Sequence, residues 1–250
     1  MTEVRITHIG GPTTLLELGG VRLLVDPTFD SPGRRYSFGW GTSSRKTAGP
    51  AVPPTELGPL NAVLLTHDQH ADNLDDAGRA LLPTVPKVLT TVAGARRLGG
   101  TAVGLAPFET ANVGNLAVTA TPSRHGPAWA VPLVGPTTGF ALRLAGETEV
   151  VWISGDTVLY PGVLEVAERF SIGTAILHLG KVQFGLTGLT RFTMTGRDAA
   201  RLCERIRPRR IVPVHYEGWS HFHEGREEIS AAFPRDRLTW LTPGVPAVLS

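Results

Sequence analysis

Histidine and aspartate side chains are concentrated directly after an apolar run in the first third of the chain. The stretch LLTHDQHADNLDDAG, residues 64–78, leaves its apolar part at Thr66 and then supplies closely spaced polar groups: His67, Gln69, His70, Asp72 and Asn73. Imidazole and carboxylate are common ligands of divalent metals, which need them at about 2.0–2.2 Å in a fixed geometry. We therefore interpret this stretch as one part of a metal site.

Other apolar segments also end in a potential ligand. The stretches are VTATPSRHGP, VWISGDT, AILHLG and IVPVHYEG, and their potential ligands are His125, Asp156, His178 and His215, respectively. A lone histidine is more often a hydrogen-bonded core or surface residue, and Asp156 alone could cap a turn. However, strand ends at one edge of a sheet converge, so the set together favours a metal site. Nitrogen and oxygen ligands without thiolate favour zinc, iron or manganese in an open catalytic site over a closed structural zinc.

Short apolar segments with turn residues between them predict the elements that must position these groups. We expect strands at residues 4–9, 14–18, 21–25, 62–65, 87–91, 116–121, 138–144, 149–154, 174–177, 210–214 and 237–241, and helices at 75–82, 92–98, 163–170, 196–207 and 224–233. The helix from Gly196 has the clearest start, with Thr195 as N-cap and Asp198 three residues on. Residues 30–59, rich in Gly, Pro, Ser and Arg, predict a long loop of the kind that forms lids or binding surfaces.

Composition indicates one soluble domain of 250 residues, with 42% hydrophobic residues, 18% charged residues and a net charge of +2. The single cysteine, Cys203, excludes an internal disulfide and suits a reducing cytoplasm. It shares a helical face with Ala199, Leu202 and Ile206, which predicts a buried thiol. No apolar run approaches the ~18 residues of a membrane span, and the N-terminus has no signal-peptide core. Basic residues are dispersed, so we expect no nucleic-acid partner and a cytoplasmic location.

The order of these segments resembles the metallo-β-lactamase fold superfamily, in particular the branch that contains ascorbate-6-phosphate lactonase and the phospholipase D that releases N-acylethanolamines. ITHIGGPTTLLELGGVRLLVDPTF is similar to the opening meander of that branch, and LLTHDQHADNLD stands where the family has His-x-His-x-Asp-His. TPSRHG, ISGDT and the pair TMTGRDAARL and IVPVHYEGW resemble the later segments. The separations from His67 through His125 and Asp156 to His215 are 58, 31 and 59 residues.

The resemblance implies an α+β fold, a four-layer αββα sandwich of two mixed β-sheets with metals at the sheet edge. It implies one or two divalent ions, zinc foremost, with manganese or iron as alternatives. The first ion would be held by His67, His70 and His125, the second by Asp72 and His215, with Asp156 bridging both. Asp26, in the Asp-Pro pair that ends the meander, would support the ligand loops.

One inserted residue separates this chain from the family pattern. Aligned on Asp72, the pattern places His70 on the second family histidine and Asn73 on the last, and leaves His67 one residue early. An amide oxygen is a poorer ligand for zinc than imidazole, so we expect a weaker, altered or empty second site. Gln69 is the alternative ligand in this stretch.

The expected activity is metal-assisted hydrolysis of a small ester, lactone or phosphodiester, in which Asp72 orients or deprotonates water and His221 protonates the leaving group. Substrate contacts are expected from His178, Tyr216 and Trp219. Two alternatives stay open: an iron-dependent oxidoreductase on the same fold, and a non-catalytic binding member with a degenerate second site. The partner is expected to be a small molecule, without nucleic acid or a membrane span, and the sequence is compatible with a homo-oligomer.

Overall fold

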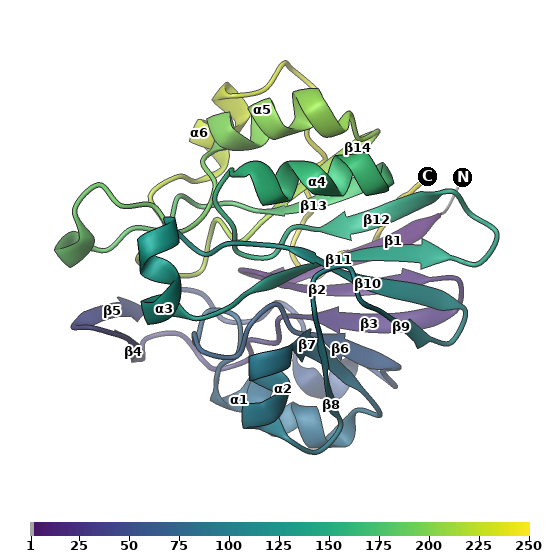
Figure 1. Cartoon of the computed structure of the whole chain (residues 1–250). Coiled ribbons are helices and arrows are strands. Elements are labelled where there is room, and N and C mark those ends of the chain that lie inside the picture. Colours follow the sequence, from purple (N-terminus) through teal and green to yellow (C-terminus); the bar gives the residue numbers. More distant parts are fainter. Residues whose placement is uncertain (1–2) are drawn as a thin grey trace.

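Two β-sheets lie face to face at the centre of the computed structural model, which describes residues 3–250 (Figure 1). Helices lie on the outer side of each sheet, so the architecture is the expected αββα sandwich and has the metallo-β-lactamase fold. Among residues 3–250, no helix is long and apolar enough to cross a membrane.

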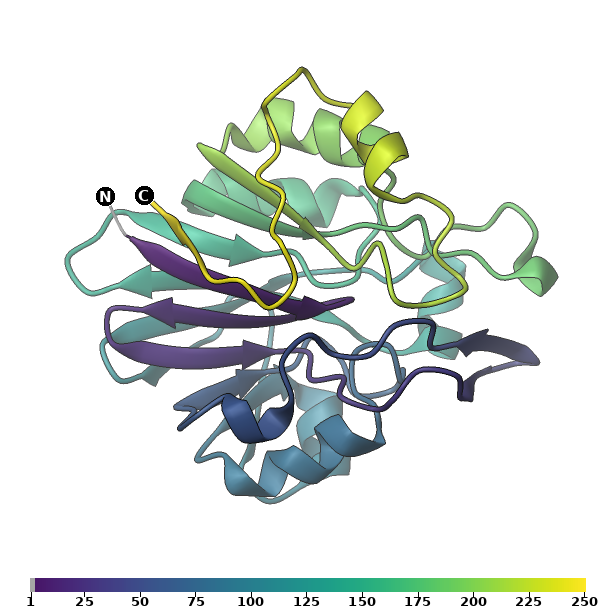
Figure 2. The ribbon, with the colours of Figure 1, turned by 180° about the vertical axis from the view of Figure 1, so that it is seen from behind.

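The first sheet has seven strands, in the order β15 (Ala247–Leu249), β1 (Val4–Gly10), β2 (Thr13–Leu18), β3 (Val21–Val25), β6 (Ala62–Leu64), β7 (Val88–Thr91) and β8 (Ala102–Leu105). The first three pairings are antiparallel, and those from β3 to β8 are parallel. Helices α1 (Asp76–Leu81) and α2 (Val92–Leu98) lie on its outer face. Strand β15 joins the edge beside β1, close to the start of the chain (Figure 2).

The second sheet has six strands, in the order β14 (Arg210–Val214), β13 (Ser171–His178), β12 (Glu149–Ile153), β11 (Thr138–Leu144), β10 (Leu116–Pro122) and β9 (Thr110–Val113). Strands β9 to β12 pair antiparallel, whereas β12, β13 and β14 are parallel. Their outer face is covered by α4 (Pro161–Arg169), α5 (Gly196–Ile206) and α6 (Arg226–Ala231).

Alternating apolar residues of the two sheets form the central core. Leu23 and Leu64 from the first sheet, and Phe140 and Ile153 from the second, belong to one fully buried cluster. A second cluster lies under α4 and α5 and includes Trp152. Burial of such side chains contributes roughly 1.5–3 kcal/mol each, which fixes the sheets and hence the positions of the strand ends.

Helix α5 begins and packs as the sequence predicts. Thr195 and Asp198 form a reciprocal capping box. The apolar face is buried and includes Leu202 and Cys203. Burial raises the pKa of the Cys203 thiol to about 12, as expected for an unreactive core cysteine.

Residues 30–59 are not the unstructured loop that we expected. They contain a hairpin of β4 (Arg35–Gly39) and β5 (Thr42–Arg45) and the short helix η1 (Pro54–Glu56). These strands are short and polar, and they are held by long-range contacts: Lys46 forms a β-bridge with Trp219, and the backbone N–H of Arg45 donates to Ser220 Oγ. Local sequence carries no signal for such contacts.

The expected strand at 237–241 is also absent from the described chain. Its backbone makes one bond to a strand of the sheet, from Thr239 N–H to the carbonyl of Ile211 at 2.8 Å, and one local bond, from Arg237 N–H to the carbonyl of Pro234 at 3.3 Å, before Pro243 interrupts the run. The terminal strand is β15 instead. Strands β8 and β9 and the short helix α3 (Val131–Val134) were not predicted.

Candidate metal centre

Asp26 holds together the loops that carry the potential ligands. It is fully buried after β3, and its carboxylate accepts hydrogen bonds from Thr66 N–H at 2.7 Å and Thr66 Oγ1 at 3.0 Å. Because a carboxylate can only accept, the Thr66 hydroxyl must donate to it. Thr66 Oγ1 therefore accepts from His67 Nδ1 at 3.1 Å, which leaves Nε2 of His67 as a free lone pair.

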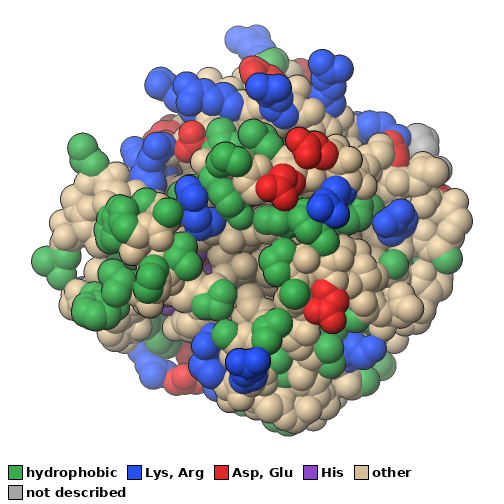
Figure 3. Space-filling model, viewed as in Figure 1, with side chains coloured by type: hydrophobic (Ala, Val, Ile, Leu, Met, Phe, Trp, Pro, Cys, Tyr) green, Lys and Arg blue, Asp and Glu red, His purple; other side chains and the backbone are tan. Residues whose placement is uncertain are grey.

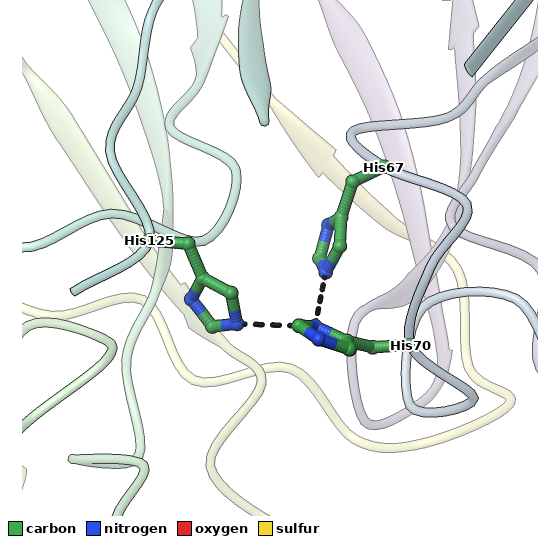
Figure 4. A group of neighbouring side chains, drawn as sticks. All are labelled: His67, His70 and His125. Atoms are coloured by element: carbon green, nitrogen blue, oxygen red, sulfur yellow. Dashed lines mark hydrogen bonds between the residues drawn. The ribbon is translucent and has the colours of Figure 1, made fainter. Parts of the chain in front are cut away.

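His67, His70 and His125 form the first group of potential ligands, and their ligand atoms lie within 4.8 Å of one another. The three rings point toward one another (Figure 4). Nδ1 of His70 lies 3.0 Å from Nε2 of His67 and 3.2 Å from Nε2 of His125. Nδ1 of His125 donates to the carbonyl of Phe192 at 2.9 Å, so its Nε2 also presents a lone pair. His67 and His70 lie in the loop that follows β6, and His125 lies in the loop that follows β10. The ends of these two strands meet at this edge of the sandwich.

Burial keeps these three histidines neutral. It lowers the pKa of His125 to about 3, with a further contribution from His70. Burial and the neighbouring rings also hold the pKa of His67 well below its ordinary value, and burial lowers the pKa of His70. Neutral imidazole is the form that binds metal, so the group is preorganised for a cation.

Asp72, Asp156 and His215 form a second group within the same mutual distance of 4.8 Å. His215 Nε2 lies 3.3 Å from Asp72 Oδ2 and 3.5 Å from Asp156 Oδ2. The two groups adjoin, because His125 Nε2 lies 4.0 Å from Asp156 Oδ2. Asp156 is therefore the member of the second group that lies beside the first group.

The carboxylates of this second group are fitted to a cation. Both oxygens of Asp156 and Oδ1 of Asp72 are buried and have no hydrogen-bond partner among residues 3–250. Burying a carboxylate without a partner is costly, and burial raises the pKa of Asp156 to about 6. Burial lowers the pKa of His215, but the charges of Asp156 and Asp72 outweigh it and raise that pKa to about 9. The donor set of imidazole nitrogen and carboxylate oxygen suits a divalent metal ion.

The structure turns the two amides of the motif away from the ligand groups. Gln69 Nε2 donates to the carbonyls of Val134 at 3.3 Å and Pro136 at 3.0 Å, so Gln69 ties the ligand loop to the end of α3. Asn73 Nδ2 donates to Asp26 Oδ2 at 3.2 Å and to Thr66 Oγ1 at 3.3 Å. Asn73 Oδ1 is buried and has no partner among the described residues.

His221 lies against the second group. Its Nε2 lies 2.9 Å from Asp72 Oδ2, and its Nδ1 lies 2.5 Å from Ser44 Oγ on the β4–β5 hairpin. Since the carboxylate accepts from Nε2–H, Nδ1 accepts the hydroxyl proton of Ser44. Ser44 was not predicted, because its contact to His221 spans 177 positions of the chain.

The three residues expected to contact substrate, His178, Tyr216 and Trp219, are all buried. His178 is fully buried, with Nε2 at 3.1 Å from Asp26 Oδ2, so it packs behind the ligand loops. Tyr216 is buried against Trp240, with ring centroids 5.2 Å apart. Trp219 is buried beside Tyr36 at 5.2 Å. None of the three is among the residues that line the cavity beside His70 and His125.

That cavity has a volume of about 80 Å³ and apolar walls. The walls include Phe38, Trp129, Leu133, Phe184 and Phe192, which the sequence did not single out. The aromatic content of residues 30–59 was the available signal for Phe38. The others lie in α3, in the short helical turn before it and in the loop between β13 and α5, and only the fold reveals that these segments converge.

Two packed mixed sheets with histidine and aspartate groups at one edge define a protein of the metallo-β-lactamase fold. A family model described as Beta-lactamase superfamily domain matches residues 21–216. The chain therefore belongs to that superfamily. The narrower lactonase and phospholipase branch stays an expectation.

The chain is similar over nearly its whole length to known proteins. A UPF0173 metal-dependent hydrolase of Pyrococcus furiosus is 25% identical over 248 residues, which cover 96% of this chain and 97% of that protein. A possible metal-dependent hydrolase from Veillonella parvula superposes with a TM-score of 0.85 at 21% identity, covering 98% of this chain and 99% of that chain. An isothiocyanate hydrolase from Delia radicum gut bacteria superposes with a TM-score of 0.80 at 22% sequence identity, and the match covers 97% of this chain and 98% of that chain. Both structures share the fold.

Proposed function

We propose that this protein is a metal-dependent hydrolase that cleaves an ester, lactone or phosphodiester bond of a small molecule. The observation that carries the proposal is the pair of adjoining groups of potential ligands. Asp156, the member of the second group beside the first, has both carboxylate oxygens buried without a hydrogen-bond partner among residues 3–250. The relatives named metal-dependent hydrolases support it.

A divalent ion held by these residues would lower the pKa of a coordinated water towards about 7 and polarise the scissile bond. His67, His70 and His125 would hold one ion through their neutral rings. Asp72 and His215 would hold the other, with Asp156 shared. Zinc fits this nitrogen and oxygen donor set best, and manganese or iron are the alternatives.

Asp72 and His221 supply the proton transfers in this proposal. Oδ2 of Asp72 accepts hydrogen bonds from His215 and His221, whereas Oδ1 has no partner among residues 3–250 and is available to accept the proton of the attacking water. Burial raises the pKa of Asp72, but these two hydrogen bonds outweigh it and keep the pKa well below its ordinary value. His221 gives its Nε2–H proton to the leaving group and is reprotonated from Asp72, with Ser44 holding the other ring nitrogen.

The second ion should bind more weakly than the first. Asn73 stands where the family has a histidine, and its Nδ2 is engaged by Asp26 and Thr66. The second group therefore offers only two carboxylates and one imidazole. In the absence of a cation, the imidazole of His215 contacts both carboxylates, and a bound cation would replace these contacts.

Metal analysis and hydrolysis assays test the proposal together. Protein purified without added metal should contain zinc or manganese and hydrolyse model esters or phosphodiesters. His125→Ala and Asp156→Ala should lose both metal and at least 100-fold of the activity, whereas His223→Ala, an exposed histidine outside both groups, should lose neither. Stoichiometric iron with O₂ uptake would instead support an oxidoreductase. Protein without metal or activity would support a binding role.

A further inference from the structure

The apolar cavity beside the first ligand group lies directly against its imidazole rings. The ring of Phe38 lies 5.4 Å from that of His70, and the ring of Phe192 lies 5.8 Å from that of His125. Phe184 lies 5.5 Å from Phe38 and stacks on His221 at 5.2 Å. A group placed in this cavity is therefore in contact with the reacting region.

Three separate loops build the walls. They are the β4–β5 hairpin, the segment of η3 (Ala128–Ala130) and α3, and the loop around η4 (Gly185–Thr187), which project on the same side of the molecule (Figure 1). A Cβ added to Gly41 at the hairpin tip would lie 3.2 Å from Leu186 Cδ1, so the hairpin touches the η4 loop. The walls thus form one continuous lining.

Apolar side chains continue from this lining onto the outer surface. Trp129 is 63% exposed, Leu133 46%, Trp40 75% and Leu186 75%. Figure 3 shows apolar side chains gathered on the left of this face, over α3 and the η4 loop. Exposed apolar patches of this kind on soluble proteins mark binding sites.

The cavity offers little to a charged ligand. Among the described residues that line it, none is Lys, Arg, Asp or Glu. Nearby cations are already engaged: Arg124 stacks over Tyr160 at 4.4 Å, and Arg191 pairs with Asp198 at 3.1 Å. Placing an ionised or polyhydroxyl group against these rings would strip its water without replacing the hydrogen bonds.

We propose that the substrate is an uncharged carboxylic ester or lactone whose apolar group, a single aromatic ring or a short alkyl chain, fills this cavity. This inference rests on the proposed hydrolysis and narrows it from three bond types to two. The scissile carbonyl faces His70, His125 and Asp72, while Phe38, Leu133 and Phe184 surround the apolar group. A diester of phosphoric acid fits less well, because it carries its charge next to the apolar walls.

A series of ethyl esters followed by proton release tests the preference. Ethyl butyrate should exceed ethyl acetate in kcat/KM by about 15-fold, from roughly fourfold for each of the two additional buried methylenes. Monoethyl succinate, a matched ester with a carboxylate at its end, should fall about tenfold or more below ethyl butyrate. Bis(p-nitrophenyl) phosphate should be the poorest of the set.

Variants of Leu133 locate the preference in the cavity. Leu133→Lys, at a partly exposed position, should abolish the advantage of ethyl butyrate over monoethyl succinate without changing metal content. Leu133→Met and Val245→Lys should keep that advantage, because Met is apolar and Val245 lies outside the lining.

Binding to metal-free protein separates this inference from the hydrolase proposal. Benzamide should quench tryptophan fluorescence in the wild type but not in Leu133→Lys, and benzoate should quench neither. If neither the esters nor the phosphodiester are hydrolysed yet benzamide binds in this way, the hydrolase proposal fails and the apolar binding site is still supported. If esters are hydrolysed without preference, or the phosphodiester is preferred, the inference is wrong. It is also wrong if Leu133→Lys alters only self-association.

Discussion

Nε2 of His221 lies 2.9 Å from Oδ2 of Asp72, although the two residues are 149 positions apart in the chain. Ser44 holds the opposite ring nitrogen, so a hairpin, the ligand loop and the segment after β14 meet at one imidazole. Because His221 belongs to neither group of potential ligands, a substitution of His221 can test proton transfer separately from metal binding.

We expect His221→Ala to lower kcat by about 10²–10⁴-fold, the usual contribution of general acid–base catalysis, while the first ligand group keeps its metal. Ser44→Ala should lower kcat less and leave KM unchanged, because it removes only the partner of Nδ1. Steady-state kinetics with metal analysis checks both. Equal kcat in wild type and His221→Ala would remove His221 from the mechanism.

The metal-free protein should lose stability as the pH falls below about 6.5. His125 has a folded pKa of about 3 against an ordinary value of 6.5, so the unfolded chain binds its proton first. The stabilising contribution is therefore full above pH 6.5 and disappears as the pH falls towards 3. Urea unfolding in the presence of a chelator at pH 4.5 and 7 should show a shallower dependence for His125→Ala, and the wild-type dependence for His223→Ala.

The ion pair between Lys46 and Asp75 should contribute strongly to the integrity of the hairpin. Lys46 Nζ lies 2.7 Å from Asp75 Oδ2, both side chains are buried, and Asp75 also accepts from the backbone N–H groups of Phe29 and Asp30. Lys46→Met leaves this carboxylate without its cation and should lower the free energy of unfolding by about 3–5 kcal/mol.

A matched exposed pair provides the control for that measurement. Arg191→Met breaks the partly exposed pair with Asp198 and should cost at most about 1 kcal/mol. Similar losses in the two variants, measured by urea unfolding, would mean that the Lys46–Asp75 pair has no special role.

Gly78 should tolerate no side chain. A Cβ at this buried position in α1 would overlap the carbonyl oxygen of Pro27, which follows Asp26 in the chain. Gly78→Ala should therefore shift α1 or the Asp-Pro turn, lower the midpoint of thermal unfolding by several degrees, and weaken metal binding. Gly185→Ala, where nothing lies within 4 Å, should leave both unchanged. An unshifted midpoint in Gly78→Ala would contradict this packing.

The parts that sequence reasoning predicted are those fixed by local pattern. Strands β3, β11 and β14 and helix α2 have the expected bounds, because apolar runs and turn residues define them. The ligand groups also follow from pattern, since strand ends at one sheet edge must converge. The family resemblance predicted which residues belong together, and the structure brings the same residues within 4.8 Å of one another in two groups.

What the sequence did not predict depends on long-range contacts. The β4–β5 hairpin exists because β5 packs on the segment of Trp219 and Ser220. His178 ends its strand like the grouped histidines, but its ring faces Asp26 behind them. The alternation of apolar and polar residues along a strand does not show whether the side chain at the strand end will face the site or the residues behind it.

The β4–β5 hairpin, α3 and the η4 loop wall the apolar cavity and contribute none of the six grouped side chains, so substrate preference can change without a change in those side chains. Gln69 is the exception, because this member of the ligand loop holds the end of α3 through the carbonyls of Val134 and Pro136. Because Gln69 lies in the stretch that carries the inserted residue, we expect the length of the ligand loop and the shape of the cavity to vary together among relatives.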